Sequence, residues 1–118
     1  MLSTMVLIGA LALQGQVPFR QTGQALLRLC DAKDPGDADN VARALWLVDD
    51  ASCSAYIEGV ADTLVGTGRT CPPQGVTLGQ NVAIALKYLK EHPGRLHEHR
   101  TVLLAAALME TFPCRKSP

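Results

Sequence analysis

The sequence predicts an all-α fold, a small disulfide-linked bundle of four to five short helices. Three observations predict it: apolar residues recur at helical spacing, Gly and Pro separate the periodic segments, and four cysteines are available for pairing. At 118 residues the chain fits one domain. Its 47% hydrophobic content supports a core, and with only two Phe, two Tyr and one Trp that core is mainly Leu, Val and Ala.

The N-terminus predicts a signal peptide over residues 1–15, which leaves 16–118 as a single helical domain. Met5 to Leu13 is an apolar run followed by small residues, and no charged side chain occurs before Arg20. The run of about nine residues is far shorter than the ~20 needed to cross a bilayer, so no membrane span is expected. Because no Lys or Arg precedes the run, the alternative is a buried N-terminal helix.

Two helices are expected before Cys53. Thr22 to Cys30 predicts a short helix, and Asp34-Pro-Gly-Asp37 is a strong turn signal. Asp37 or Asp39 can cap the next helix, in which Trp46 flanks the stripe. The residues expected to face inward are Leu26, Leu27 and Cys30 in the first helix and Val41, Ala44, Leu45 and Val48 in the second.

The segment from Cys53 to Leu64 continues as helix, with Cys53, Ile57, Val60 and Leu64 on one side. The ring of Tyr56 is expected to pack inward while its hydroxyl finds a partner. Gly59 costs up to ~1 kcal/mol of helix propensity, which suggests that another helix passes close by. Glycines and Cys71-Pro-Pro then make a connector.

Thr77 and Gln80 have the form of a capping box and begin the next helix. Pro93 disfavours helical geometry at His92, so this helix ends there, and Pro93 can be the first residue of the last helix. The expected apolar stripes are Leu78, Val82, Ala85, Leu86 and Leu89 in the former, and Leu96, Leu103, Leu104, Ala107, Leu108 and Thr111 or Phe112 in the latter.

Four cysteines in a short, exported chain indicate two disulfides, for which three pairings exist. We favour Cys30 with Cys53 and Cys71 with Cys114, because each pair would join neighbouring helices. If Asp37 to Asp50 formed one straight helix, it would carry the chain about 20 Å away, and Cys53 would need a returning loop to reach Cys30. The first pair is therefore the less secure of the two.

Composition and motifs argue against an enzyme and a cofactor. Eleven basic and eleven acidic residues cancel, so a nucleic acid partner is not expected. Glu58 and Asp62 are four residues apart, as in some carboxylate pairs, but a solvated helix face is the commoner reason for this spacing. There is no phosphate-binding loop, nucleophile elbow or Cys-x-x-Cys motif.

Three histidines, His92, His97 and His99, cluster with Glu91 and Glu98. His97 and His99 point about 200° apart on a helix, so they do not easily share a metal. We expect His92 to be a cap, His97 to be partly buried, and no metal to bind. The alternative is a small metal-binding module that uses His92 to His99.

The segment from Cys53-Ser-Ala-Tyr-Ile-Glu-Gly-Val-Ala-Asp62 to Phe112-Pro113-Cys114 resembles the Tai family of immunity proteins against type VI secretion amidase effectors. Between these ends lie a Gly-Val-Thr helix start, Lys-Tyr-Leu, His92-Pro93, Leu-His and Ala-Leu. Thr22 to Cys30 is a weaker match, and more residues separate Cys30 from Cys53 than in the family pattern.

The resemblance implies a periplasmic protein without a cofactor that occludes the active-site cleft of a peptidoglycan amidase, with a projecting loop or helix of a homodimer. It makes Asp62 a capping or packing acid. Hypothetical partner contacts lie on the connector and on the enlarged helix, at Arg43, Trp46, Arg69 and Gln74. The alternative within the family is an exported envelope protein, chaperone-like or stress-related, without an amidase partner.

Overall fold

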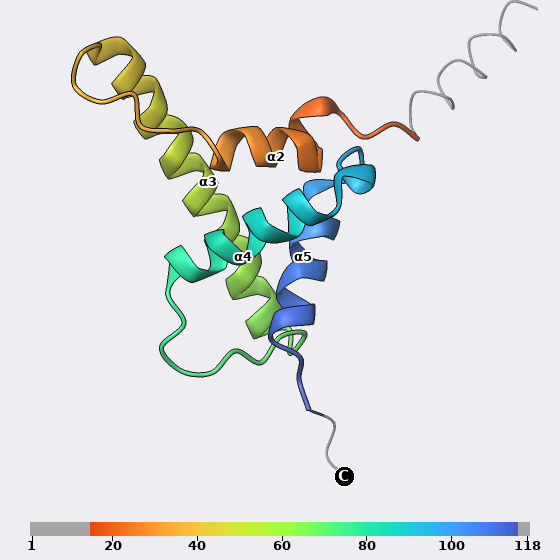
Figure 1. Cartoon of the computed structure of the whole chain (residues 1–118). Helices are drawn as coiled ribbons and strands as arrows, with labels where there is room; N and C mark the ends of the chain where they lie inside the picture. The colour runs from red at the N-terminus through yellow and green to blue at the C-terminus, as the bar shows by residue number, and fades with distance from the viewer. Residues whose placement is uncertain (1–14, 116–118) are drawn as a thin grey trace, which may run out of the picture.

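The computed structural model describes residues 15–115, which form four α-helices and two short 3-10 helices but no strand (Figure 1). The predicted all-α class is therefore confirmed, while the predicted signal peptide lies almost wholly outside the described residues. No helix in this part of the chain is long and apolar enough to cross a membrane. In chain order, the elements are η1 (Phe19–Gln21), α2 (Gly23–Cys30), α3 (Asn40–Gly66), α4 (Leu78–Glu91), η2 (Pro93–Arg95) and α5 (Arg100–Thr111).

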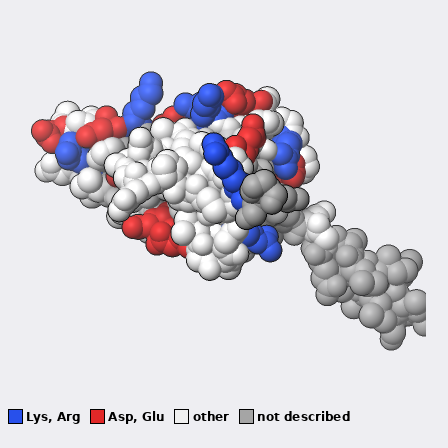
Figure 2. Space-filling model, turned by 90° about the horizontal axis from the view of Figure 1, so that it is seen from below, with Lys and Arg blue, Asp and Glu red and all other residues white. Residues whose placement is uncertain are grey.

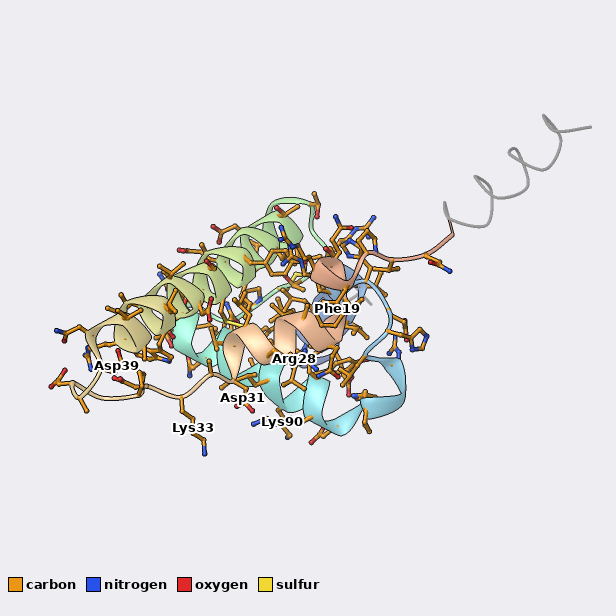
Figure 3. The ribbon with its side chains drawn as sticks, turned by 90° about the horizontal axis from the view of Figure 1, so that it is seen from above. Phe19, Arg28, Asp31, Lys33, Asp39 and Lys90 are labelled. Carbon is orange, nitrogen blue, oxygen red and sulfur yellow. A yellow bond between two sulfur atoms is a disulfide. The ribbon has the colours of Figure 1, made fainter. Side chains whose placement is uncertain are left out.

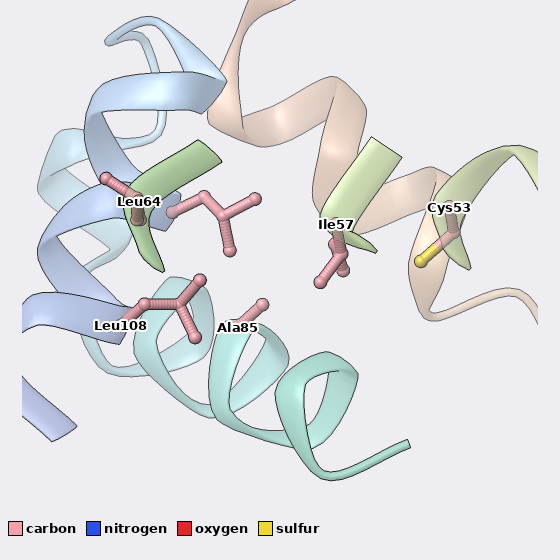
Figure 4. Close-up of a cluster of buried hydrophobic side chains, with 6 residues drawn as sticks. Cys53, Ile57, Leu64, Ala85 and Leu108 are labelled. Carbon is pink, nitrogen blue, oxygen red and sulfur yellow. The ribbon is translucent and has the colours of Figure 1, made fainter. Parts of the chain in front are cut away.

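The core lies where the C-terminal half of α3 meets α4 and α5, with α2 across one end (Figure 4). One buried cluster consists of Cys53, Ile57, Leu64, Ala85, Leu104 and Leu108. The other consists of Leu26, Tyr88, Leu89, Leu103 and Ala107. The stripes predicted for α4 and α5 thus face the core except at Leu86, which is half-buried and packs against neither cluster. Phe112 packs against the first cluster, while Thr111 is exposed.

Side-chain caps fix the starts of the helices where the sequence predicts them. Asp39 accepts hydrogen bonds from the backbone N–H groups of Val41 and Ala42, at 3.0 and 3.1 Å. Thr77 accepts one from Gln80 N at 3.2 Å, and the Gln80 side chain accepts one from Thr77 N at 2.7 Å. Each cap satisfies N–H groups that have no partner in the first helical turn.

The predicted buried stripe in the first half of α3 is wrong. Val41, Leu45 and Val48 are 70%, 63% and 62% exposed, and Ala44 is also exposed. This helix has 27 residues, and all its buried residues lie from Cys53 onwards, because its N-terminal half extends beyond the bundle (Figure 1). Helical spacing identifies an apolar face, but it does not show that another element covers that face.

Both predicted disulfides are present, with Cα atoms 5.2 Å apart in Cys30–Cys53 and 4.9 Å apart in Cys71–Cys114. The long helix and the first disulfide are compatible because residues 31–39 run outward to the start of α3, past Lys33 to Asp39 (Figure 3), and the helix itself returns. Nine extended residues span about 30 Å, which is enough to reach the start of the helix. The predicted turn also forms, since Gly36 N donates to Asp34 Oδ1 at 2.8 Å.

The last helix begins later than predicted. Pro93 opens η2, and α5 starts only at Arg100. The carbonyls of Leu96 and Glu98 accept hydrogen bonds from Gln24 N and Gly23 N, each at 2.9 Å. These carbonyls accept hydrogen bonds from N–H groups in the first turn of α2, which have no partner within that helix. The segment between η2 and α5 therefore stays non-helical and caps α2.

The close approach expected at Gly59 occurs at Gly23 instead. A Cβ atom added at Gly59 would meet no other side chain within 4 Å, whereas one at Gly23 would clash with the buried side chain of Leu103. We therefore expect Gly23→Ala to lower the free energy of unfolding by about 1–3 kcal/mol through overpacking. Gly59→Ala should raise it by about 0.5–1 kcal/mol through helix propensity. Urea unfolding followed by circular dichroism measures both, and equal effects would contradict this assignment.

Candidate partner-binding site

The structure separates the four predicted partner contacts into two places. Arg43 and Trp46 lie near the start of α3, whereas Arg69 and Gln74 lie on the connector, residues 67–77, which follows the other end of that helix. Gly66 lies twenty positions after Trp46 on this helix, a distance of about 30 Å. The two pairs therefore belong to separate surfaces.

Arg43 and Trp46 hold residues 31–39 against α3. The Arg43 guanidinium pairs with the carboxylates of Asp34 and Asp37, each at 3.2 Å, and Trp46 Nε1 donates to the carbonyl of Ala32 at 3.0 Å. Both polar groups are already satisfied within the chain. Their structural role is to fasten this loop to the projecting half of the helix.

The connector, in contrast, presents exposed side chains on a backbone that hydrogen bonds hold in place. Arg69 N and Thr70 N both donate to the carbonyl of Leu64, at 2.8 and 3.3 Å, and Thr70 is buried. Cys71 N donates to the carbonyl of Phe112 at 2.9 Å, beside the disulfide to Cys114.

Gly68 and Gly75 take φ values of 70° and 96°, which other residues rarely adopt, and Pro72 and Pro73 restrict the chain between them. Arg69 and Gln74 are exposed on this frame. The second predicted pair therefore lies on a constrained loop.

Beneath the connector, α3 and α4 border a hollow of about 170 Å³. Asn81 Oδ1 is buried there without a hydrogen-bond partner in the described part of the chain, and Asp62 lies at the rim. Glu58 and Asp62 are both exposed on α3. The resemblance makes Asp62 a capping or packing acid. It lies inside α3, whose N-cap is Asp39, so it does not cap this helix, and the packing role stays a prediction.

A larger apolar groove of about 460 Å³ lies between α3 and the start of α5. At its edge, Tyr56 packs against the core and its hydroxyl lies 2.6 Å from Thr101 Oγ1, as predicted. The Arg100 guanidinium covers the ring of Tyr56 at 4.0 Å. Gly59 and Val60 also line the groove, and no charged side chain does.

Two of the three histidines act as helix caps. His92 is the C-cap of α4, as predicted, and its Nδ1 donates to the carbonyl of Tyr88 at 2.7 Å while the two rings stack. His99 is the N-cap of α5 and accepts from Thr101 N at 3.1 Å. His97 is exposed, so its predicted partial burial is wrong. Within residues 15–115, no three His, Cys, Asp or Glu residues come together as a metal site.

Arg95 links this turn to α4. Its guanidinium donates to both carboxylate oxygens of Glu98, at 2.7 and 3.0 Å, and to the hydroxyl of Tyr88 at 2.6 Å. The hydrogen bonds from Arg95 lower the pKa of the Glu98 carboxyl below its ordinary value of 4.5, although desolvation opposes them. The same contact raises the pKa of Arg95. Tyr88, whose burial the sequence reasoning missed, lies three residues after Ala85 on the core face of α4.

The lowered pKa of Glu98 predicts a pH-dependent contribution to stability. A carboxyl whose pKa is lower in the folded state stabilises above its unfolded pKa, and the contribution is lost as pH falls through the folded value. Glu98→Gln should therefore lower the urea midpoint at pH 7, and the difference from the wild type should shrink as pH falls below 4.5. Urea titrations from pH 7 to pH 2 measure this. A difference that is constant across the range would contradict the assignment.

Charged side chains of both signs lie in small groups with broad uncharged areas between them (Figure 2). No large field of one sign marks a binding face there.

The sequence matches a known protein family over most of its length. The model of the family described as Rap1a immunity proteins matches residues 22–114. Among curated proteins, none matches the sequence significantly. The matched range includes all four helices, both disulfides and the connector.

Proposed function

The chain belongs to the Rap1a immunity protein family, a family of type VI secretion systems, and we propose that it binds and occludes the active-site cleft of a peptidoglycan amidase effector. The family match over residues 22–114 carries this proposal. The resemblance of Cys53 to Cys114 to amidase immunity proteins supports the choice of effector. In this proposal the protein acts in the periplasm, as a homodimer and without a cofactor.

Two features support the proposed compartment. The structure contains two disulfides, and disulfides form and persist in oxidising environments such as the periplasm. The apolar run in the predicted signal peptide, residues 1–15, agrees with export.

We place the effector contact on the connector, with Arg69 and Gln74 as its contacting side chains. A loop that enters a cleft loses less conformational freedom on binding when it is already rigid, and rigidity of this kind improves affinity. The connector has its backbone bonded to Leu64 and Phe112 and is anchored by Cys71–Cys114. Arg43 and Trp46 are less suited to this role because their polar groups are engaged with residues 31–39.

The test is inhibition of a panel of type VI peptidoglycan amidases by the oxidised protein. Wild type should bind one of them tightly and stop hydrolysis of peptidoglycan. Arg69→Ala/Gln74→Ala should weaken inhibition at least about tenfold, since truncating a hot-spot residue of an interface costs about 2 kcal/mol or more and Arg is common among hot spots. Failure of the wild type to inhibit any amidase would reject the proposed target.

The matched control is Arg20→Ala/Gln21→Ala, which changes one exposed Arg and one exposed Gln on η1, away from the connector. This control should inhibit as the wild type does. If the connector variant also inhibits normally while folded, the amidase target stands and the connector is not the contact surface.

A further inference from the structure

The hollow beneath the connector combines apolar walls with a few polar side chains. It measures about 170 Å³, whereas a site for a drug-sized molecule needs ~300 Å³ or more. Its size therefore suits a single long side chain. Its polar side chains are Asp62, Thr70 and Asn81, and its apolar walls include Val65, Pro72, Val76, Leu108 and Phe112.

Two of these polar side chains are buried without a hydrogen-bond partner. Asn81 Oδ1 accepts no hydrogen bond within residues 15–115. Thr70 is only 4% exposed, and its hydroxyl makes no hydrogen bond in the same part of the chain. Because buried polar groups in folded proteins nearly always have a partner, two such groups in one hollow indicate a place that a ligand or water fills.

The charge around the hollow is negative. Asp62 lies at its rim, is exposed and forms no ion pair with any described residue. Glu58, four residues earlier on α3, borders an adjoining hollow that Asp62 and Asn81 also line. Among the described residues, no Lys, Arg or His lines either hollow. This arrangement attracts a cation and disfavours an anion.

We propose that the hollow receives a lysine or arginine side chain of the effector. Both have an apolar stem that ends in a cation, and the cation only donates hydrogen bonds. The stem packs against Pro72 and Phe112, while the cation pairs with the Asp62 carboxylate at the rim. Asn81 is half-buried and its side chain makes no hydrogen bond within residues 15–115, so its amide can turn to present Oδ1 to the cation.

The position of the hollow favours an effector side chain over a free small molecule. Thr70, Pro72 and Val76 belong to the connector and also line the hollow. An effector that contacts Arg69 and Gln74 therefore holds its own side chains beside the opening. Interfaces concentrate their binding energy in anchors of this kind, in which one side chain fills a pocket. This inference rests on the proposed function and names the effector group that it requires.

The first test needs no effector. The chloride salts of n-butylguanidinium and n-butylammonium, which copy the two side chains, are added to the full oxidised chain at matched ionic strength. In amide NMR spectra they should shift the signals of Thr70, Val76 and Asn81, with a dissociation constant of about 1–10 mM. The tighter probe identifies the effector residue as arginine or lysine. n-Butanol, which has the stem without the charge, should bind at least about fivefold more weakly.

Asp62→Asn should raise the dissociation constant of the tighter probe about fivefold, through loss of one favourable ion pair. The matched control is Asp50→Asn, which changes an exposed aspartate on the same helix about 18 Å away and should leave the constant unchanged. If neither probe shifts these signals at about 50 mM, water alone fills the hollow and the inference is overturned. Equal binding by Asp62→Asn, or equal shifts with n-butanol, would also overturn it.

The second test is the amidase assay, which separates this inference from the proposed function. Asp62→Asn should weaken inhibition about fivefold, and Asp50→Asn should inhibit as the wild type does. If wild type and Asp62→Asn inhibit equally, the amidase target stands and the effector does not use the hollow. If the probes bind but the wild type inhibits no amidase, the proposed function fails and takes the effector side chain with it.

Discussion

Replacing all four cysteines with serine is expected to unfold most of the protein at 37 °C. The two disulfides join residues 23 and 43 positions apart. In the loop-entropy model, closing these loops stabilises the fold by about 3 and about 4 kcal/mol. The loss of about 7 kcal/mol is a large share of the ~5–15 kcal/mol that stabilises a typical domain. Serine at Cys53, which is only 2% exposed, adds the cost of a buried hydroxyl.

Urea unfolding followed by circular dichroism should show this loss. The variant with Cys71→Ser and Cys114→Ser should lose about 4 kcal/mol and keep the first disulfide. Reduction of the wild type with dithiothreitol should reproduce the loss of stability seen when all four cysteines are replaced with serine. If the reduced protein kept its free energy of unfolding within about 1 kcal/mol, the disulfides would not be the main supports of this small Leu/Ala core.

The features that the sequence predicts well depend on neighbouring residues. The side chains of Thr77 and Gln80 each accept a hydrogen bond from the other's backbone N–H within one helical turn. The Asp39 side chain accepts one from the backbone N–H of Val41, in the first turn of the helix that Asp39 caps. The helical class follows for the same reason, since spacing along α4 and α5 identifies most of the residues that pack together, although it misses Tyr88.

The features that it misses depend on distant segments. The spacing of Val41, Leu45 and Val48 correctly indicates a helix with an apolar side, but the bundle ends before it reaches them. The role of Gly23 is likewise invisible locally, because the side chain that excludes a Cβ there belongs to Leu103 on α5.

The candidate site shows the same division. The sequence places Arg69 and Gln74 on a connector with Gly and Pro, and the structure adds that Leu64 and Phe112 fix its backbone. It does not reveal that Trp46 is engaged by a carbonyl fourteen residues earlier. That the partner is an effector follows from the family match and not from the geometry of the site.

Ile57→Ala is expected to lower the free energy of unfolding by about 2–5 kcal/mol, the range for truncating a fully buried isoleucine. Ile57 is 0% exposed and packs in the cluster with Leu104 and Leu108, where α3, α4 and α5 meet (Figure 4). The upper part of the range applies if the surrounding helices do not relax into the cavity. Cys53 of the first disulfide belongs to this cluster, and the second disulfide ties the chain at another point, so both should limit that relaxation.

Val65→Ala on the same helix is the matched control, because Val65 is 49% exposed and belongs to neither buried cluster. It should change the free energy of unfolding by no more than about 0.5 kcal/mol. Urea unfolding under oxidising conditions measures both variants. A loss below about 1 kcal/mol for Ile57→Ala would mean that the half of α3 from Cys53 onwards is held mainly by its covalent links and not by packing.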